Sequence, residues 1–166
     1  MRWRISSVLS WHIMMQIASD VIARLRGKTI ATAESLTGGG IGAALTAVPG
    51  ASAVFKGGVI SYTDEVKRGV LGVPAAYLTT FGAVSAPVAE AMALGVMDLL
   101  QTDVAISVTG LAGPTGDAFG HPVGSVFIGY CSRHTGFSKE YHFSGDRESI
   151  RNQTIEAAFQ LLLENV

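Results

Sequence analysis

The chain has 166 residues, of which 48% are hydrophobic and 20 are glycine, and its formal net charge is −1. This length allows one domain with a substantial core, and the composition excludes a disordered chain, while the lack of a basic surplus argues against a sequence-independent nucleic-acid binder. The single cysteine, Cys131, excludes an internal disulfide framework and a cysteine-rich metal site, so we expect a cytoplasmic protein.

The N-terminal segment has the arginines and the apolar run of a signal peptide, but serines interrupt the run and no small-residue cleavage site follows. The run is also too short to span a membrane. We expect residues 1–10 to be an irregular extension and residues 11–166 to form the domain. Apolar residues at helical spacing then predict a first helix from about Ser10 that ends before Gly27.

A turn of small residues joins a strand-like run, residues 29–33, to an apolar helical pattern, residues 39–48. This arrangement is typical of a site at the C-terminal edge of a sheet, where backbone amides and a helix N-terminus face an anion. Ser35 opens the turn as a nucleophile whose oxyanion the following amides hold, or else Ser35 or Thr37 serves only as an N-cap. The candidate oxyanion donors follow it: Thr37, Gly38 and Gly39.

The rest of the chain alternates between strand and helix patterns. Strands are expected at residues 54–62, 104–110, 123–131 and 135–143, and helices at residues 64–71, 74–81, 85–100 and 146–164. The glycine pair at residues 57–58 predicts a bulge or a close backbone approach. These elements predict a single α/β domain with a mixed sheet, which we expect to form a three-layer α/β/α sandwich.

A second glycine-rich loop follows the expected strand at residues 104–110. Ligands of α/β domains bind outside the carboxyl ends of strands, so this loop and the turn after residue 33 are expected to flank one crevice. The second loop would supply the wall opposite the serine, through Thr109, Gly110 and Gly113.

A serine nucleophile needs a base, because its free hydroxyl is protonated at neutral pH. Of the four histidines, only His121, at the end of a loop, is a candidate. The alternative is Lys67, which lies across a strand-to-helix corner from Tyr62. A partly desolvated lysine can accept the serine proton, and Tyr62 would relay that proton or hold the lysine. Otherwise, Lys67 is a solvated helix residue and Tyr62 an aromatic residue at the edge of the core.

Arg147 and Arg151 lie four residues apart at the start of the last expected helix. They form either a pair suited to a phosphate or carboxylate, or a solvated pair beside Glu148. The sequence has no metal-binding motif, no P-loop and no dinucleotide-binding glycine pattern, so we expect no metal and no cofactor. We expect a small-molecule ligand, no nucleic-acid or membrane partner, and a homo-oligomer, for which the apolar helices leave room.

Several segments together resemble a known family, and their order along the chain is highly specific. They are residues 32–39, 55–67, 82–85, 107–114, 122–124 and 143–147. Over residues 15–164, the chain resembles the CinA C-terminal domain, or nicotinamide-nucleotide amidase (PncC), family. The resemblance implies an α/β/α fold and an amidase that needs no cofactor. Such an enzyme would hydrolyse nicotinamide mononucleotide to nicotinate mononucleotide and ammonia in pyridine-nucleotide recycling.

The resemblance also implies roles for individual residues. Ser35 would be the nucleophile, Lys67 its base and Tyr62 the hydroxyl partner of the pair. The amides after Thr37 would hold the oxyanion, and the wall of the nucleotide site would be formed by the loop at residues 109–113 and by Arg147. Two other functions stay open. The chain could be a nucleotide-binding module that catalyses no reaction, or a serine hydrolase that acts on another small amide.

The chain departs from the family pattern at two positions. Leu36 stands where cysteine is common, and Asp64 stands where asparagine is frequent. A carboxylate at position 64 would favour the protonated form of Lys67 and so oppose its role as a base. The resemblance does not include the N-terminal domain of the longer CinA proteins, so we do not expect a role in DNA uptake to transfer.

Overall fold

The computed structural model describes residues 3–166, with side chains from Ser10 onward. In chain order the elements are α1 (Trp3–Arg24), β1 (Ile30–Glu34), α2 (Gly40–Thr46), a 3-10 turn η1 (Ala51–Ala53), β2 (Phe55–Ile60), α3 (Asp64–Gly69), α4 (Ala75–Phe81), α5 (Ala86–Leu100), β3 (Val104–Gly110), β4 (Ser125–Ser132), β5 (Gly136–His142) and α6 (Arg147–Asn165). Each strand and helix expected from the sequence is present, and the main difference concerns where α1 begins.

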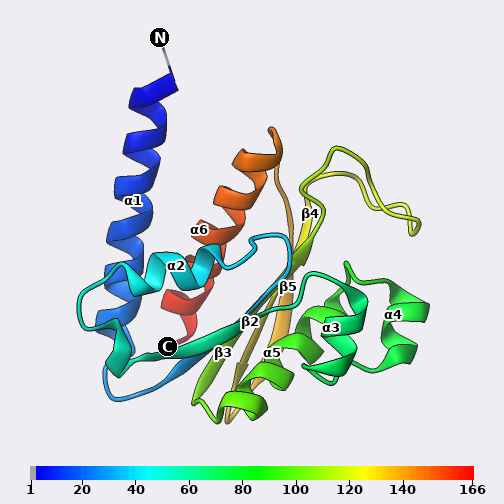
Figure 1. Cartoon of the computed structure of the whole chain (residues 1–166), viewed down its shortest axis with the longest axis horizontal. Coiled ribbons are helices and arrows are strands. Elements are labelled where there is room, and N and C mark those ends of the chain that lie inside the picture. Colours follow the sequence, from blue (N-terminus) through cyan, green and yellow to red (C-terminus); the bar gives the residue numbers. More distant parts are fainter. Residues whose placement is uncertain (1–2) are drawn as a thin grey trace.

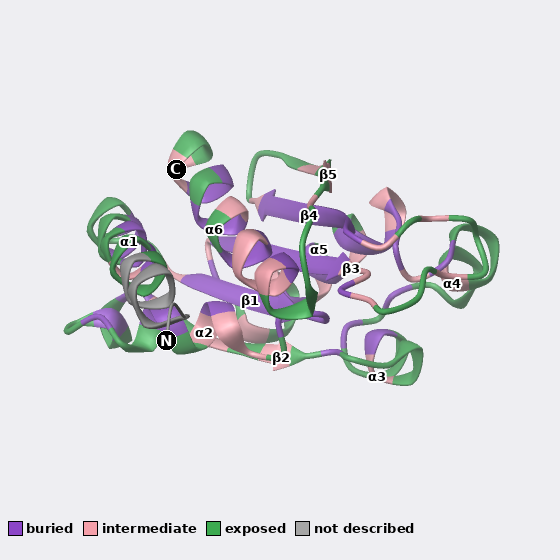
Figure 2. Ribbon diagram, turned by 90° about the horizontal axis from the view of Figure 1, so that it is seen from above, coloured by how far each residue is buried: buried purple, intermediate pink, exposed green. Residues whose placement is uncertain are grey.

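The strands form one five-stranded sheet in the order β2-β1-β3-β4-β5. β1 pairs in parallel with both β2 and β3, whereas β4 and β5 form an antiparallel hairpin at one edge. The sheet is therefore mixed, as predicted. Figure 2 shows that the three central strands are buried. The edge strand β2 alternates between partly buried and exposed positions, and β5 also contains both kinds without regular alternation.

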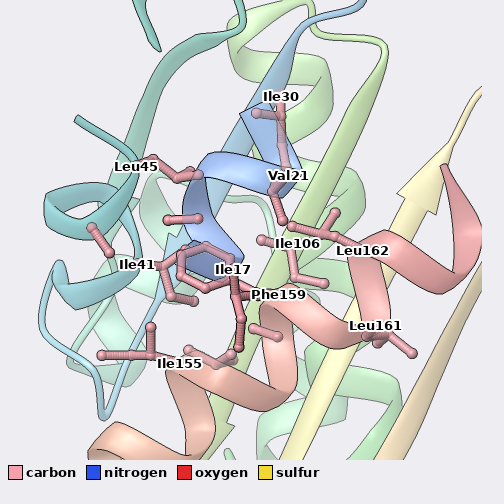
Figure 3. Close-up of a cluster of buried hydrophobic side chains, with 14 of the residues drawn as sticks. Ile17, Val21, Ile30, Ile41, Leu45, Ile106, Ile155, Phe159, Leu161 and Leu162 are labelled. Carbon is pink, nitrogen blue, oxygen red and sulfur yellow. The ribbon is translucent and has the colours of Figure 1, made fainter. Parts of the chain in front are cut away.

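Helices cover both faces of the sheet (Figure 1). α1, α2 and α6 pack on one face, where their apolar side chains meet those of Ile30 and Ile106 (Figure 3). α5 packs on the other face against Ala31 and Ala105, because successive strand residues point to opposite faces. The three-layer sandwich is confirmed, with one apolar core on each side of the sheet.

Small residues let α5 lie close to its neighbours. A Cβ atom at Gly129 of β4 would lie 2.4 Å from the Ala89 carbonyl oxygen, and one at Gly95 of α5 would lie 2.0 Å from the Leu71 carbonyl oxygen. Neither distance is tolerated by a real side chain, so these positions require glycine. The close packing fixes the helix layer next to the segment that connects α3 to α4.

The expected irregularity in β2 is confirmed at the glycine pair. The register between β1 and β2 shifts after Ile30, which pairs with Phe55, so that Ala31 pairs with Gly57. A Cβ at Gly58 would lie 2.1 Å from the Thr32 hydroxyl oxygen. The glycines thus bring the two backbones close together immediately before the corner that carries Tyr62 and Lys67.

Helix α1 begins at Trp3, which corrects the expected start near Ser10. The N-terminal segment contains no proline or glycine before Gly27, and its serines lower helix propensity only slightly. The helix therefore includes most of the segment that was expected to be irregular. No helix within residues 3–166 combines the length and the apolar character needed to cross a bilayer.

Candidate active site

The candidate site lies at the edge of the sheet where β1 and β3 end. These strands are parallel neighbours, so the turn after β1 and the loop after β3 meet at one place. They border a cavity of about 290 Å³. Its lining comes from the turn, the β2–α3 corner, the segment before α5, the loop after β3 and α6: Ser35, Leu36, Tyr62, Asp64, Lys67, Ala83, Val84, Thr109, Gly110, Leu111, Ala112, Gly113, Thr115 and Arg147. The expected crevice between the two glycine-rich loops is confirmed.

Ser35 is not a helix cap. The N-cap position of α2 is occupied by Gly39, so no side chain at that position caps the helix. The Ser35 amide donates to the Val108 carbonyl of β3 at 3.1 Å, and the Gly38 amide donates to the Ser35 carbonyl at 3.1 Å. The backbone of Ser35 is therefore fixed on both sides, and its hydroxyl lies at the cavity.

Lys67 extends from α3 to Ser35. Its Nζ lies 3.2 Å from the Ser35 Oγ, 2.9 Å from the Ser61 carbonyl and 3.4 Å from the Tyr62 carbonyl. The residue is 2% exposed, although lysine is almost never fully buried unless it is paired. The interpretation of Lys67 as a solvated helix residue is therefore wrong.

The environment of Lys67 favours the neutral amine. Burial lowers the pKa of Lys67, and the negative charge of Asp64 opposes this effect by a smaller amount. The ordinary pKa of a lysine would leave the amine protonated near pH 7, and a protonated amine cannot act as a base. A buried amine in contact with a serine hydroxyl is thus a suitable acceptor for the serine proton.

Tyr62 takes a different position from the one expected for a hydroxyl partner. The residue is 58% exposed, and its hydrogen bond with Lys67 is made by the backbone carbonyl and not by the phenol. The phenolic oxygen accepts a hydrogen bond of 3.1 Å from Arg147 Nη2, and Arg147 Nη1 donates to the Gly113 carbonyl at 2.6 Å. Arg147 therefore joins three segments at the cavity, and its role toward a ligand stays a prediction.

The glycines of the turn do not line the cavity. The amide of Gly38 is used within the turn, and Thr37 directs its hydroxyl to Glu34 Oε1 at 2.7 Å. Leu36 lines the cavity instead, between Ser35 and the buried Thr37. Thr109 and Gly110 at the end of β3, with Gly113 in the loop beyond, do lie in the opposite wall.

Glu34 is a buried residue whose role the sequence did not reveal. Its carboxylate accepts hydrogen bonds from the amides of Ile41 at 2.8 Å and Gly42 at 3.1 Å, in addition to the bond from Thr37. The N-terminus of α2 therefore binds an internal carboxylate and not a ligand anion. An acidic residue just before a small-residue turn and a helix is the signal that predicts this cap.

His121 is not brought to Ser35. Its Nδ1 lies 2.8 Å from Asp117 Oδ2, and the amide of His121 donates to the other oxygen of the same carboxylate at 2.9 Å. This pair stabilises the loop between β3 and β4 and lies outside the cavity lining. Within the described residues, no three His, Cys, Asp or Glu side chains gather in a group that could hold a metal.

Comparisons with known proteins identify the family of the chain. The family model described as the CinA C-terminal domain matches residues 14–166. A CinA-like protein of Synechococcus sp. (strain CC9311) is 60% identical over 114 residues, which cover 68% of this chain and 27% of that protein. A CinA-like protein of Endomicrobium trichonymphae is 47% identical over 151 residues, which cover 87% of this chain and 35% of that protein. The chain thus spans about a third of the curated relatives that it matches.

Solved structures match over most of both chains. The competence/damage inducible protein CihA from Agrobacterium tumefaciens superposes with a TM-score of 0.88 at 37% identity, covering 91% of this chain and 94% of that one. A competence-damaged protein (CinA) superfamily protein from Escherichia coli superposes with a TM-score of 0.90 at 31% identity, covering 92% and 90% of the two chains. The fold is therefore that of CinA superfamily proteins.

Proposed function

Because the chain belongs to the CinA C-terminal domain family, we propose that it is an amidohydrolase that converts nicotinamide mononucleotide into nicotinate mononucleotide and ammonia. The observation that carries this proposal is the contact of 3.2 Å between the Ser35 hydroxyl and the buried amine of Lys67. A serine paired with a desolvated lysine is suited to acyl transfer, because the neutral amine can take the serine proton.

The first half of the reaction forms an acyl-enzyme. Ser35 Oγ attacks the carboxamide carbon while its proton moves to Lys67 Nζ, and the carbonyl oxygen becomes an oxyanion. When the tetrahedral intermediate collapses, the C–N bond breaks and Lys67 passes the proton to the leaving nitrogen, which departs as ammonia. Lys67 thus acts first as a general base and then as a general acid.

The second half releases the acid. A water molecule gives a proton to Lys67 Nζ and attacks the acyl carbon, and the bond between that carbon and Ser35 Oγ breaks. Lys67 returns the proton to Ser35, so the enzyme is restored and the products are a carboxylic acid and ammonia. Lys67 Nζ takes part in every proton transfer of this sequence, so the sequence requires no metal and no second base.

The cavity also supports a small, anionic substrate. Its volume of about 290 Å³ matches the lower end of ligand pockets. Arg147 supplies a guanidinium at its mouth, where a phosphate can be bound through two parallel hydrogen bonds. The Gly113 carbonyl and the Tyr62 hydroxyl, which Arg147 contacts now, would release those donors when the phosphate binds.

The test is ammonia release from nicotinamide mononucleotide by the purified protein, with and without a chelator. Ser35→Ala should abolish release and leave the fold intact, whereas Ser52→Ala, an exposed serine in η1, should behave like the wild type. Wild-type turnover by Ser35→Ala would refute the assignment. Binding of the nucleotide without release would favour the non-catalytic module, and release from other small amides alone would favour a different hydrolase.

A further inference from the structure

Arg151 of α6 holds the turn that follows Ser35. Its Nε donates to the Leu36 carbonyl at 2.9 Å, and its Nη2 donates to the Thr37 carbonyl at 3.1 Å. Within the turn, the Gly38 amide donates to the Ser35 carbonyl. The Gly40 amide also donates to the Thr37 carbonyl, at 3.0 Å. The carbonyl groups of three consecutive residues are therefore all fixed, and one guanidinium supplies two of the four donors.

A fixed carbonyl also fixes the amide that shares its peptide plane. The C=O and N–H of a trans peptide point in opposite directions, so the amides of Leu36 and Thr37 point away from the fixed carbonyls of Ser35 and Leu36. Neither amide donates a hydrogen bond within the described chain, although both residues are buried. Unpaired buried amides are rare, and beside a nucleophile they are the donors that an oxyanion requires.

Arg151 does not line the cavity that contains Ser35, although Arg147 borders both that cavity and the one beside Arg151. Leu36 lines the cavity that contains Ser35, whereas Arg151 lines a second cavity of about 490 Å³ that also involves Thr37 and residues of α1 and α2. Arg151 therefore contacts the backbone carbonyls of the turn from outside the cavity of Ser35. Its effect on the reaction has to pass through the backbone of the turn.

We propose that Arg151 is a positioning residue, which directs the amides of Thr37 and Leu36 at the oxyanion formed when Ser35 attacks. Its bond to the Leu36 carbonyl fixes the amide of Thr37. Its bond to the Thr37 carbonyl fixes the amide of Gly38, which holds the Ser35 carbonyl and thereby the amide of Leu36. This inference rests on the proposed acyl transfer at Ser35. The residue after a nucleophilic serine commonly provides such an amide. Arg151 thus has a different role from Arg147, which lies at the mouth of the cavity, although the two arginines are one helical turn apart.

The first readout is the rate at which a fluorophosphonate labels Ser35, which is monitored by mass spectrometry of the intact protein. In this reaction the Ser35 Oγ–P bond forms, the P–F bond breaks with release of fluoride, and negative charge develops on the phosphoryl oxygen. We expect Arg151→Gln to slow labelling about tenfold or more, since loss of one oxyanion donor costs about 100-fold to 1,000-fold. Arg151→Lys keeps one donor and should be intermediate. Asn152→Ala, from the same second cavity, should match the wild type.

The second readout separates positioning from binding. With nicotinamide mononucleotide, kcat of Arg151→Gln should fall by the same factor as labelling, while KM stays within about twofold. A raised KM at unchanged kcat, or equal labelling of Arg151→Gln and the wild type, would overturn the role of Arg151. Circular dichroism confirms that each variant is folded. An unlabelled wild type that also releases no ammonia would refute the proposed function itself, and with it the inference that depends on it.

Discussion

Replacing Lys67 by methionine tests the protonation state of the buried amine without any substrate. Burial lowers the pKa of Lys67 in the folded protein below its ordinary value of 10.5. Between these two pKa values the unfolded chain binds a proton that the folded protein does not bind, so the free energy of unfolding of the wild type rises with pH. Lys67→Met lacks this titration, and its stability should lack this rise.

The structure also sets the difference in free energy of unfolding between the wild type and Lys67→Met that we expect at high pH. Lys67 donates to the carbonyl of Ser61 at 2.9 Å, and Ser61 is fully buried. Methionine fills a similar space but leaves that carbonyl unpaired, at a cost of about 1–3 kcal/mol. Near pH 10.5 the variant should be less stable than the wild type by about this amount, and the deficit should shrink by about 1.4 kcal/mol for each unit of pKa lowering as the pH falls.

Urea unfolding of the two proteins between pH 7 and pH 10.5 measures this difference. Other titrating groups are common to both proteins and cancel in the comparison. Lys28→Met, at an exposed position, controls for the loss of a positive charge. A deficit that stays constant over this range would show that folded Lys67 holds its proton as firmly as a lysine in water, and such a lysine could not serve as the base for Ser35.

Three further predictions concern neighbouring groups. In Asp64→Asn, loss of the charge that raises the pKa of Lys67 should move the acidic limb of the pH–rate profile to lower pH, and a move to higher pH would contradict this. Glu34→Gln should lower the free energy of unfolding by about 2 kcal/mol in urea, because one amide of α2 loses its acceptor. Tyr62→Phe should keep kcat within about tenfold of the wild-type value, because the phenol bonds Arg147 and not Lys67. A thousandfold loss of kcat would indicate that the hydroxyl acts as a proton relay.

The sequence predicted most elements because capping residues mark where helices begin. Thr63 accepts from the amide of Val66 at the start of α3, and Asp146 accepts from the amide of Ser149 at the start of α6. The start of α1 was not predictable in this way, since no residue in its first turns prevents a helix. Its hydrophobic pattern is interrupted by serines that the backbone tolerates.

The pairing of Ser35 with Lys67 was only partly predictable. Spacing placed Tyr62 and Lys67 at one corner, but strand alternation continues beyond β2, so that Ser61 is buried and the side chain of Tyr62 is exposed. The hydroxyl of Ser61 makes no hydrogen bond within the described chain, and no local pattern marked this residue. The desolvation of Lys67 depends on segments that are far apart in the sequence, and a single-sequence pattern does not contain that information.

The position of Glu34 keeps its carboxylate from opposing the effect of burial, which lowers the pKa of Lys67. Glu34 is adjacent to Ser35 in the sequence, but its carboxylate is directed to the N-terminus of α2, where two amides and the Thr37 hydroxyl bind it. A carboxylate at hydrogen-bond distance from Lys67 would favour the ammonium form and remove the base. The carboxylate that does act on Lys67 is the exposed Asp64, whose effect is smaller than that of burial. The turn therefore separates the buried carboxylate from the buried amine, as the proposed proton transfer from Ser35 to Lys67 requires.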